Sequence, residues 1–252
     1  MLPTRLLVVL SACVLVGAQA SAAVPRVKWA FAARSNLYGS PIVADVHPSP
    51  GQETIVSDAE ARLVRCVSAK GKLLWTFGGG WVRRVVNVPS LSLKAQPGRA
   101  LLVVGCADRL LQCIDARDGK RVWARHVGGL DWGTAVWADL DGDGRDEVVA
   151  GTRADGIVAL GARGRKLWRY RGEDAAHPIR IGGPIAASDV DGDGKAEVFA
   201  CTSLGPVCVG GDGKLRWSRL TGDGWPGAPL IADLDGDGAA EVVCASNEEN
   251  AL

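Results

Sequence analysis

Short apolar runs separated by polar turns repeat along most of the chain. Three such runs, 148–150, 198–200 and 242–244, each follow a stretch rich in Asp and Gly. A polar turn, a second apolar run, a Gly-containing turn and a Trp-bearing segment follow the first two of them. This alternation is typical of successive antiparallel hairpins. No segment keeps an apolar stripe of helical period for three turns, so the pattern argues against helices.

Tryptophan marks the repeat length. Successive members of one series are separated by 46, 48, 45 and 49 residues: Trp29, Trp75, Trp123, Trp168 and Trp217. The last four close a phrase of the form Gly-Lys/Arg-x-x-Trp. A further short strand is expected before two of the Asp-rich stretches, at 134–137 and 184–187. Four strands per period of about 46 residues predict an all-β fold, a β-propeller of four-stranded antiparallel blades with five units visible in residues 23–252.

Three segments share the pattern D-x-D-G-D-G-x-x-E and are called the acidic loops here: 139–147, 189–197 and 233–241. Four carboxylates in nine residues repel one another unless a hard cation lies between them, and oxygen ligands on a Gly-punctuated loop suit Ca²⁺. The expected carboxylate ligands are Asp139, Asp141, Asp143, Glu147, Asp189, Asp191, Asp193, Glu197, Asp233, Asp235, Asp237 and Glu241.

Two other interpretations of the acidic loops were weighed. An EF-hand needs an acid at position 12 and flanking helices, but Ala150, Ala200 and Cys244 stand there and apolar runs follow. A plain Asp-Gly hairpin turn would not require all four acids in three copies. We therefore predict three Ca²⁺ sites and no organic cofactor.

The first two units depart from this pattern. Unit one keeps Asp45 and Glu53 at the ends of its loop but has His47 and Ser49 in place of the middle acids. In unit two Asn87 is aligned with the first Asp. We predict that neither loop binds a metal ion.

The acidic loops resemble the FG-GAP or VCBS calcium-binding repeats of integrin-type propellers. The resemblance implies that Arg145, Lys195 and Ala239 supply backbone carbonyl ligands. The family often ends its loop in Asp, where this chain has Glu. The Trp phrase, clearest at 115–123, is similar to the tryptophan-docking repeat of quinoprotein-like (PQQ-like) propellers. Together the two resemblances cover about residues 26–252.

The N-terminus has the features of a secretory signal peptide. Arg5 precedes an apolar run at 6–17, and small residues at 18–22 provide cleavage signals. The run is short for a membrane span, although 10–13 also resembles a bacterial lipobox. We expect residues 1–22 to be removed and the protein to be secreted or periplasmic. The remaining chain is electrically neutral, which argues against nucleic acid as a partner.

Six of the seven cysteines follow the signal peptide. Cys106 and Cys113, and likewise Cys201 and Cys208, are seven residues apart across the same kind of hairpin. We predict both pairs as cross-strand disulfides, with buried thiols in the blade core as the alternative. Cys66 and Cys244 are expected to be free.

The fifth unit ends at residue 252, after its second expected strand. The sequence therefore favours a piece of a longer propeller over a five-bladed ring with a thin closing blade.

One aromatic residue precedes each of four loops, on the face expected to lie opposite the acidic loops: Tyr38, Trp81, Trp132 and Trp225. With Arg180 nearby, they could stack on a sugar or another planar ligand. The alternative, that these rings only pack between blades, remains open.

Catalysis is the weaker interpretation. The chain has three His residues, none in a recognisable nucleophile context, and no Cys-Cys dipeptide of the kind that quinoprotein dehydrogenases often use. Calcium propellers also resemble polysaccharide lyases of the rhamnogalacturonan type. The sequence therefore favours a secreted, non-catalytic calcium-binding propeller that recognises a protein or carbohydrate ligand, with a polysaccharide lyase-like or quinoprotein-like enzyme as the alternative.

Overall fold

The computed structural model describes residues 27–33, 40–58, 61, 63–78, 90–96, 99–105, 109–130, 135–173, 178–219 and 227–244. The expected signal peptide lies outside these residues, and so do Tyr38, Trp81, Asn87, Cys106, Trp132 and Trp225. Within the described part there is no helix long and apolar enough to cross a membrane.

Eighteen strands form four four-stranded antiparallel sheets and one hairpin. The first sheet contains β1 (Ile42–Ala44), β2 (Glu53–Asp58), β3 (Leu63–Val67) and β4 (Leu73–Gly78). The second contains β5 (Ser90–Gln96), β6 (Arg99–Gly105), β7 (Leu110–Asp115) and β8 (Arg121–His126). The third contains β9 (Ala135–Ala138), β10 (Glu147–Thr152), β11 (Gly156–Leu160) and β12 (Lys166–Tyr170). The fourth contains β13 (Ile185–Ser188), β14 (Glu197–Thr202), β15 (Gly205–Val209) and β16 (Leu215–Ser218), and the hairpin contains β17 (Leu230–Ala232) and β18 (Glu241–Val243).

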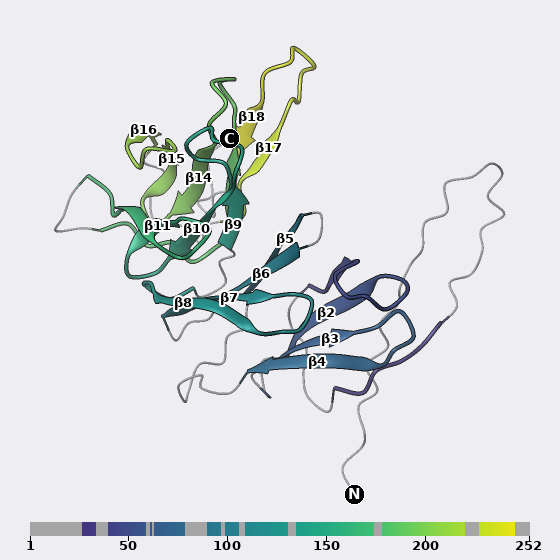
Figure 1. The fold of residues 1–252 in the computed structure, drawn as a ribbon. Coiled ribbons are helices and arrows are strands. Elements are labelled where there is room, and N and C mark those ends of the chain that lie inside the picture. Colours follow the sequence, from purple (N-terminus) through teal and green to yellow (C-terminus); the bar gives the residue numbers. More distant parts are fainter. Residues whose placement is uncertain are drawn as a thin grey trace, which may run out of the picture.

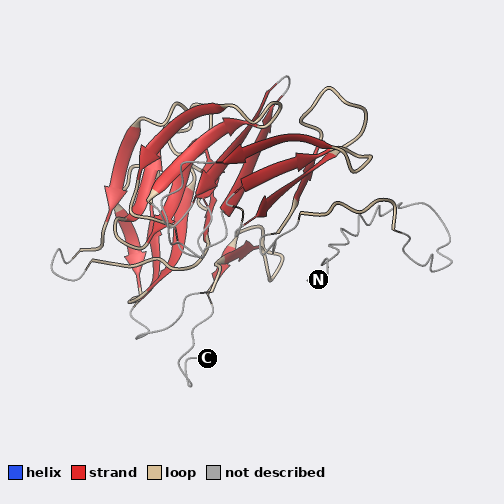
Figure 2. Ribbon diagram, turned by 90° about the horizontal axis from the view of Figure 1, so that it is seen from below, coloured by secondary structure: helices blue, strands red, loops and turns tan. Residues whose placement is uncertain are grey.

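Each sheet is a simple meander in which consecutive strands are hydrogen-bonded neighbours. The sheets follow one another in space as they do in sequence (Figure 1). All the regular elements of the described residues are strands (Figure 2). The first strands of successive sheets, β5, β9, β13 and β17, pack side by side. This arrangement confirms the predicted all-β fold of four-stranded antiparallel blades.

The hydrophobic core lies between successive sheets, in three clusters. Strand β10 shows how the sequence produces this. Val149 packs in the cluster shared with the fourth sheet, whereas Val148 and Ala150 pack in the cluster shared with the second sheet. Because side chains alternate between the faces of a strand, an apolar run such as 148–150 buries both faces. The apolar runs in the sequence are therefore the central strands of stacked sheets.

The Trp series joins each unit to the next. The ring of Trp75 lies on Gly119, and a Cβ atom placed on that glycine would come within 2.8 Å of the ring. The indole Nε1 of Trp75 also donates to the carbonyl oxygen of Ala116, at 3.0 Å. The glycine of each phrase thus packs against the Trp of the preceding unit. The pairs are Trp29 with Gly71, Trp75 with Gly119, Trp123 with Gly164 and Trp168 with Gly213.

The alignment of unit two through Asn87 was wrong. The first strand of the second sheet begins at Ser90, after Asn87, and pairs with β6 as far as Gln96 opposite Arg99. The loop equivalent to an acidic loop therefore has only two residues, 97 and 98. A connection of this length has no room for the nine residues of a metal loop.

The structure describes three of the four cysteines in the predicted disulfides. Cys113, Cys201 and Cys208 carry free thiols. In the hairpin of β14 and β15, Cys201 lies opposite Pro206 and Cys208 lies opposite Phe199. The two cysteines are therefore offset by one diagonal step, and sequence spacing alone could not reveal this register. Cys113 is buried in the cluster between the second and third sheets, and its predicted partner Cys106 lies outside the described residues.

The Trp–Gly contact predicts that Gly164→Ala destabilises the fold. Gly164 has a φ of 76°, and an added Cβ would lie 2.7 Å from the ring of Trp123. Gly192 is a matched control because its φ is 78° but nothing lies within 4 Å of the added Cβ. In metal-free solution we expect Gly192→Ala to lower the free energy of unfolding by about 1 kcal/mol. We expect Gly164→Ala to lower the free energy of unfolding by about 2–4 kcal/mol, because the added methyl group also overpacks the contact with the ring of Trp123. Equal urea midpoints for the two variants would contradict the docking role.

Candidate metal centres

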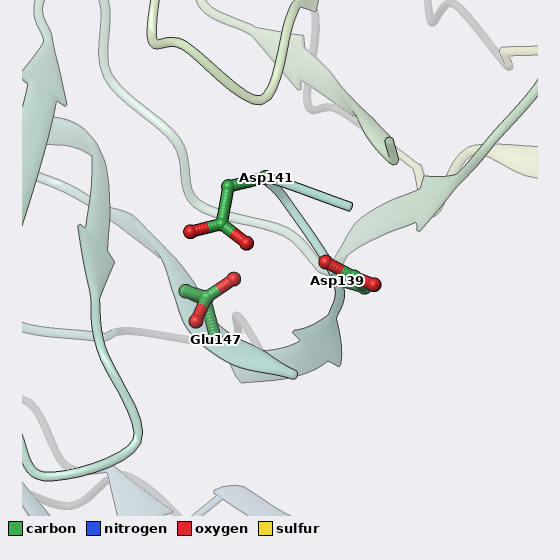
Figure 3. A group of neighbouring side chains, drawn as sticks. All are labelled: Asp139, Asp141 and Glu147. Atoms are coloured by element: carbon green, nitrogen blue, oxygen red, sulfur yellow. The ribbon is translucent and has the colours of Figure 1, made fainter. Parts of the chain in front are cut away.

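The three acidic loops join the first and second strands of the third sheet, the fourth sheet and the final hairpin. In the loop between β9 and β10, ligand oxygens of Asp139, Asp141 and Glu147 lie within 4.8 Å of one another. Figure 3 shows the carboxylates of these three residues gathered on the inner side of the loop. Asp189, Asp191 and Glu197 form the second group, and Asp233, Asp235 and Glu241 the third.

The first Asp of each loop organises the backbone. One carboxylate oxygen of Asp139 accepts the N–H of Gly142 and the other accepts the N–H of Gly144, each at 2.8 Å. Both glycines have a φ of 80°, in the left-handed region that favours glycine. The same pair of bonds recurs at Asp189 and Asp233. This Asp therefore fixes the turn, a role that its place in the pattern did not reveal.

The last Glu of each loop binds the backbone near the start of that loop. Glu147 is buried, and its Oε2 accepts the backbone N–H of Leu140 at 3.1 Å. Burial raises the pKa of Glu147, and the negative charges of Asp141, Asp143 and Asp139 raise the pKa further, against the effect of the Leu140 bond. Burial and the neighbouring acids raise the pKa of Glu197 in the same way.

The remaining acid of each loop is placed differently. Asp143 is exposed, lies outside the group of three, and accepts the backbone N–H of Arg145 at 2.8 Å. The corresponding bonds run from Lys195 to Asp193 and from Ala239 to Asp237. The structure thus brings together three of the four predicted carboxylates in each loop. The predicted carbonyl ligands at 145, 195 and 239 stay predictions.

Burial and hydrogen bonding act in opposite directions on the carboxyl pKa values of the first acidic loop. Desolvation works to raise the pKa of Asp139, but the backbone N–H groups of Gly144 and Gly142 outweigh it and lower that pKa. The pKa of Asp139 is thus lowered while the pKa of Glu147 is raised. A divalent cation among these oxygens would remove the penalty on Glu147 and the repulsion together. The three groups could each hold a metal ion, and their all-oxygen donor set is compatible with calcium.

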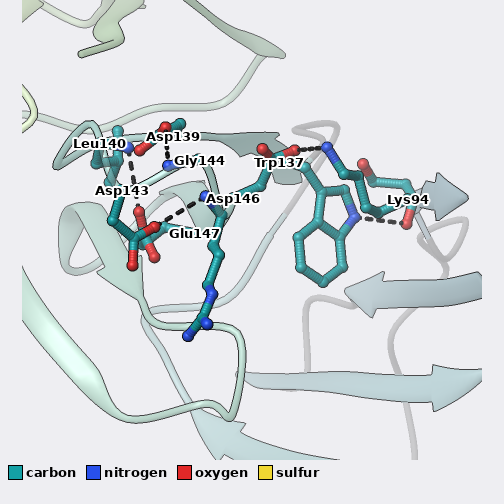
Figure 4. Close-up of polar contacts among 10 residues, drawn as sticks. Lys94, Trp137, Asp139, Leu140, Asp143, Gly144, Asp146 and Glu147 are labelled. Atoms are coloured by element: carbon teal, nitrogen blue, oxygen red, sulfur yellow. Dashed lines mark hydrogen bonds and ion pairs between the residues drawn. The ribbon is translucent and has the colours of Figure 1, made fainter. Parts of the chain in front are cut away.

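The first acidic loop also contacts the sheets on both sides of it. The backbone N–H of Ala196, in the next acidic loop, donates to the carbonyl oxygen of Asp139 at 2.7 Å. On the other side, Lys94 of β5 forms an ion pair with Asp146 (Figure 4). Trp137, in the strand that leads into the loop, donates its Nε1 to the carbonyl oxygen of Ser92, at 3.2 Å. The first acidic loop and the strand that leads into it therefore bond to both the second and the fourth sheets.

The loop of unit one places its last Glu in the same way but surrounds it with different groups. Glu53 is fully buried and accepts the backbone N–H of Val46, as Glu147 accepts that of Leu140. The other oxygen of Glu53 accepts the hydroxyl of Ser49 at 2.8 Å, and the Oγ of Ser49 lies 3.0 Å from the Nδ1 of His47. Neutral donors therefore surround this carboxylate. That unit one binds no metal stays a prediction.

The predicted ligand platform lies almost wholly outside the described residues. Of its members only Arg180 is described, and its side chain is exposed. The backbone N–H of Arg180 donates to the hydroxyl of Ser203, and its carbonyl oxygen accepts the backbone N–H of the same residue. The ligand platform therefore stays a prediction.

Comparison with known families supports the repeat assignment for part of the chain. Residues 189–244, which include the second and third acidic loops, match the FG-GAP-like repeat family. Among proteins of curated function, none matches the chain.

Several solved structures share the fold. The rhamnogalacturonan lyase YesW superposes with a TM-score of 0.64 at 22% identity, over 85% of this chain and 48% of that one. The V. cholerae biofilm matrix protein Bap1 gives 0.61 at 21% identity, over 83% of this chain and 35% of that one. BBS1N, crystallised in complex with ARL6DN, superposes with a TM-score of 0.60 at 13% identity, over 88% of this chain and 65% of that one. These neighbours have propeller-type folds, and this chain spans less than two thirds of each of them.

The raised pKa values of Glu147 and Glu197 predict how stability depends on pH. A carboxylate whose folded pKa is raised binds protons more tightly when folded, so its contribution is full below the unfolded pKa and is lost as pH rises through the folded pKa. Metal-free protein should therefore gain stability from this source as the pH falls from neutrality towards 4.5, the ordinary pKa of a glutamate. The lowered pKa of Asp139 acts below its unfolded value, outside this window.

Calcium should reverse this trend, because the ion binds the deprotonated carboxylates and competes with protons. The stabilisation caused by calcium is expected to shrink from about pH 7 to about pH 5. Urea unfolding of metal-free and calcium-loaded protein at each pH measures the difference. Glu147→Gln should remove part of the pH dependence. A calcium effect that grows on acidification would contradict the placement of these carboxylates.

Proposed function

We propose that the chain is a calcium-binding β-propeller of the FG-GAP or VCBS kind. The observation that carries the proposal is the threefold recurrence of two Asp and one Glu with ligand oxygens within 4.8 Å of one another. Oxygen-only donors on a glycine-rich loop suit a hard cation that tolerates irregular coordination, which favours Ca²⁺ over Mg²⁺. Asp143, Asp193 and Asp237 would complete the ligand sets by a small movement of exposed side chains.

The role of the ions is to join sheets. An ion held by Asp139, Asp141 and Glu147 would stiffen a loop that already bonds to Ala196 of the next acidic loop. Extracellular modules bind calcium with dissociation constants of about 10⁻⁴ to 10⁻³ M. At millimolar calcium a constant near 10⁻⁴ M gives about 1.4 kcal/mol for each site, and three sites give about 4 kcal/mol. That is a large share of the stability of a typical domain, about 5–15 kcal/mol.

The protein would act as a secreted or periplasmic scaffold or recognition module for a protein or carbohydrate. Calcium at millimolar concentration is expected outside the cytoplasm, which agrees with the signal-peptide features of residues 1–22. Two neighbours of similar fold support such a role, since one is a biofilm matrix protein and another was crystallised with a protein partner. No catalytic constellation is needed for this function.

The proposal predicts that removal of calcium lowers the melting temperature. EGTA should lower the free energy of unfolding by about 4 kcal/mol, and Asp141→Ala should abolish about a third of that difference. Asp45→Ala is the matched control because it changes the first Asp of the unit-one loop, in which Ser49 already serves Glu53. It should leave the calcium effect unchanged. Identical melting curves with and without EGTA would contradict the proposal.

A polysaccharide lyase is the second candidate, favoured by the superposition on the rhamnogalacturonan lyase YesW. At 22% identity this likeness extends to the fold alone. A lyase would release unsaturated uronides from rhamnogalacturonan, detected by ultraviolet absorbance. We expect no such release by the calcium-loaded chain. Sustained release that calcium removal abolishes would replace the scaffold role with a catalytic one.

A further inference from the structure

Two cysteines from neighbouring sheets meet near the end of the described chain. The thiols of Cys201, at the end of β14, and Cys244, directly after β18, share a side-chain hydrogen bond. The two cysteines stand at the same level of the two sheets. In the fourth sheet Ala200 is paired with Ile185, the first residue of β13, and Cys201 follows it. In the final hairpin Val243 is paired with Leu230, the first residue of β17, and Cys244 follows it.

The strand alternation explains why Cys201 faces the hairpin. Val198 and Ala200 point into the core shared with the third sheet. Phe199 and Cys201 therefore point to the opposite face of β14, on which Phe199 contacts Trp217, with ring centroids 6.2 Å apart. The hairpin follows on that side, since β17 packs against β13, and Figure 1 shows β17 and β18 beside the fourth sheet.

Cys208, the partner of Cys201 that the sequence predicts, is less suitable for a disulfide with Cys201. Cys208 lies opposite Phe199, a diagonal step away from Cys201, within the same sheet. Burial and the negative charges of Glu197 and Asp191 raise the pKa of the Cys208 thiol, against the positive charge of Arg216. The hydrogen-bonded neighbour of Cys201 is Cys244.

We propose that Cys201 and Cys244 form an intersheet disulfide that links the second strands of the fourth sheet and the final hairpin. The oxidant is a low-molecular-weight disulfide such as oxidised glutathione. The Cys244 thiolate attacks one sulfur of that disulfide, forms a mixed disulfide and releases one glutathione thiolate. The Cys201 thiol then loses its proton, attacks the Cys244 sulfur and releases the second glutathione. Two protein thiols and one glutathione disulfide thus give one protein disulfide and two glutathione thiols.

The environment of each thiol suits this order of events. Cys244 is half-buried and can be reached by the oxidant, whereas Cys201 is 4% exposed. The hydrogen bond from Cys201 lowers the pKa of Cys244 to about 7, against the effect of burial. The same bond, together with burial, raises the pKa of Cys201. Since the thiolate is the nucleophile, Cys244 reacts first and Cys201 resolves the mixed disulfide.

Peptide mapping of the full chain tests the pairing. Protein equilibrated with oxidised and reduced glutathione is treated with iodoacetamide and digested with trypsin without reduction. Trypsin separates 196–214, which carries Cys201 and Cys208, from 220–252, which carries only Cys244. We expect these two peptides to be joined and lighter by two hydrogens than their sum, while the peptides of Cys66 and Cys113 carry the alkyl group.

Two serine variants assign the sulfur within 196–214. Cys208→Ser should keep the link between the peptides, and Cys201→Ser should lose it. A link that persists in Cys201→Ser would assign the bond to Cys208 and overturn the proposal. Complete alkylation of Cys201 and Cys244 in natively folded wild-type protein, checked by circular dichroism, would overturn it as well. The calcium sites do not enter this test, so its outcome is independent of the proposed function.

Discussion

Mutual repulsion of carboxylates at the turns between the first two strands of successive sheets is the constraint on which this structure depends. Asp139, Asp141 and Glu147 come together because the backbone of the loop leads them there. The N–H groups of Gly142 and Gly144 bind both oxygens of Asp139, and burial holds Glu147 beneath it. The backbone of the loop thus directs the three carboxylates towards one another, as a bound cation would require.

The sheets are joined at two levels. One level is the Trp–Gly contact, in which an indole packs on a left-handed glycine of the following unit. Trp75, Trp123 and Trp168 also donate a hydrogen bond to a carbonyl oxygen there. The other level is the loop between the first two strands, where Ala196 bonds to Asp139. Unit one keeps the first level through Trp29 and Gly71. At the second level Ser49 and backbone N–H groups donate hydrogen bonds to its Glu53. The loop of unit one is therefore held by neutral donors, whereas the later loops gather acidic side chains.

The repeat pattern was enough to predict the strands and the acidic groups, because both follow from local sequence. Apolar runs such as 148–150 lie in central strands, and three of the four acids in each acidic loop converge. Contacts between units were harder to predict. The Trp phrase gave the period, but that the indole of Trp75 packs on Gly119 of the next unit depends on how the sheets stack. The register that separates Cys201 from Cys208 is likewise invisible in their spacing. Asn87 was wrongly aligned with the first Asp because the loop of unit two is shorter. A search for acidic residues cannot detect such a shortened loop.

The most direct test is the number of calcium ions that the folded protein binds. Equilibrium dialysis against calcium, followed by elemental analysis, should find three ions for each chain, one for each group of acids. Asp141→Ala should bind one ion fewer, and Asp45→Ala should bind as many as the unaltered protein. A folded protein that retains no calcium at millimolar concentration would contradict the account.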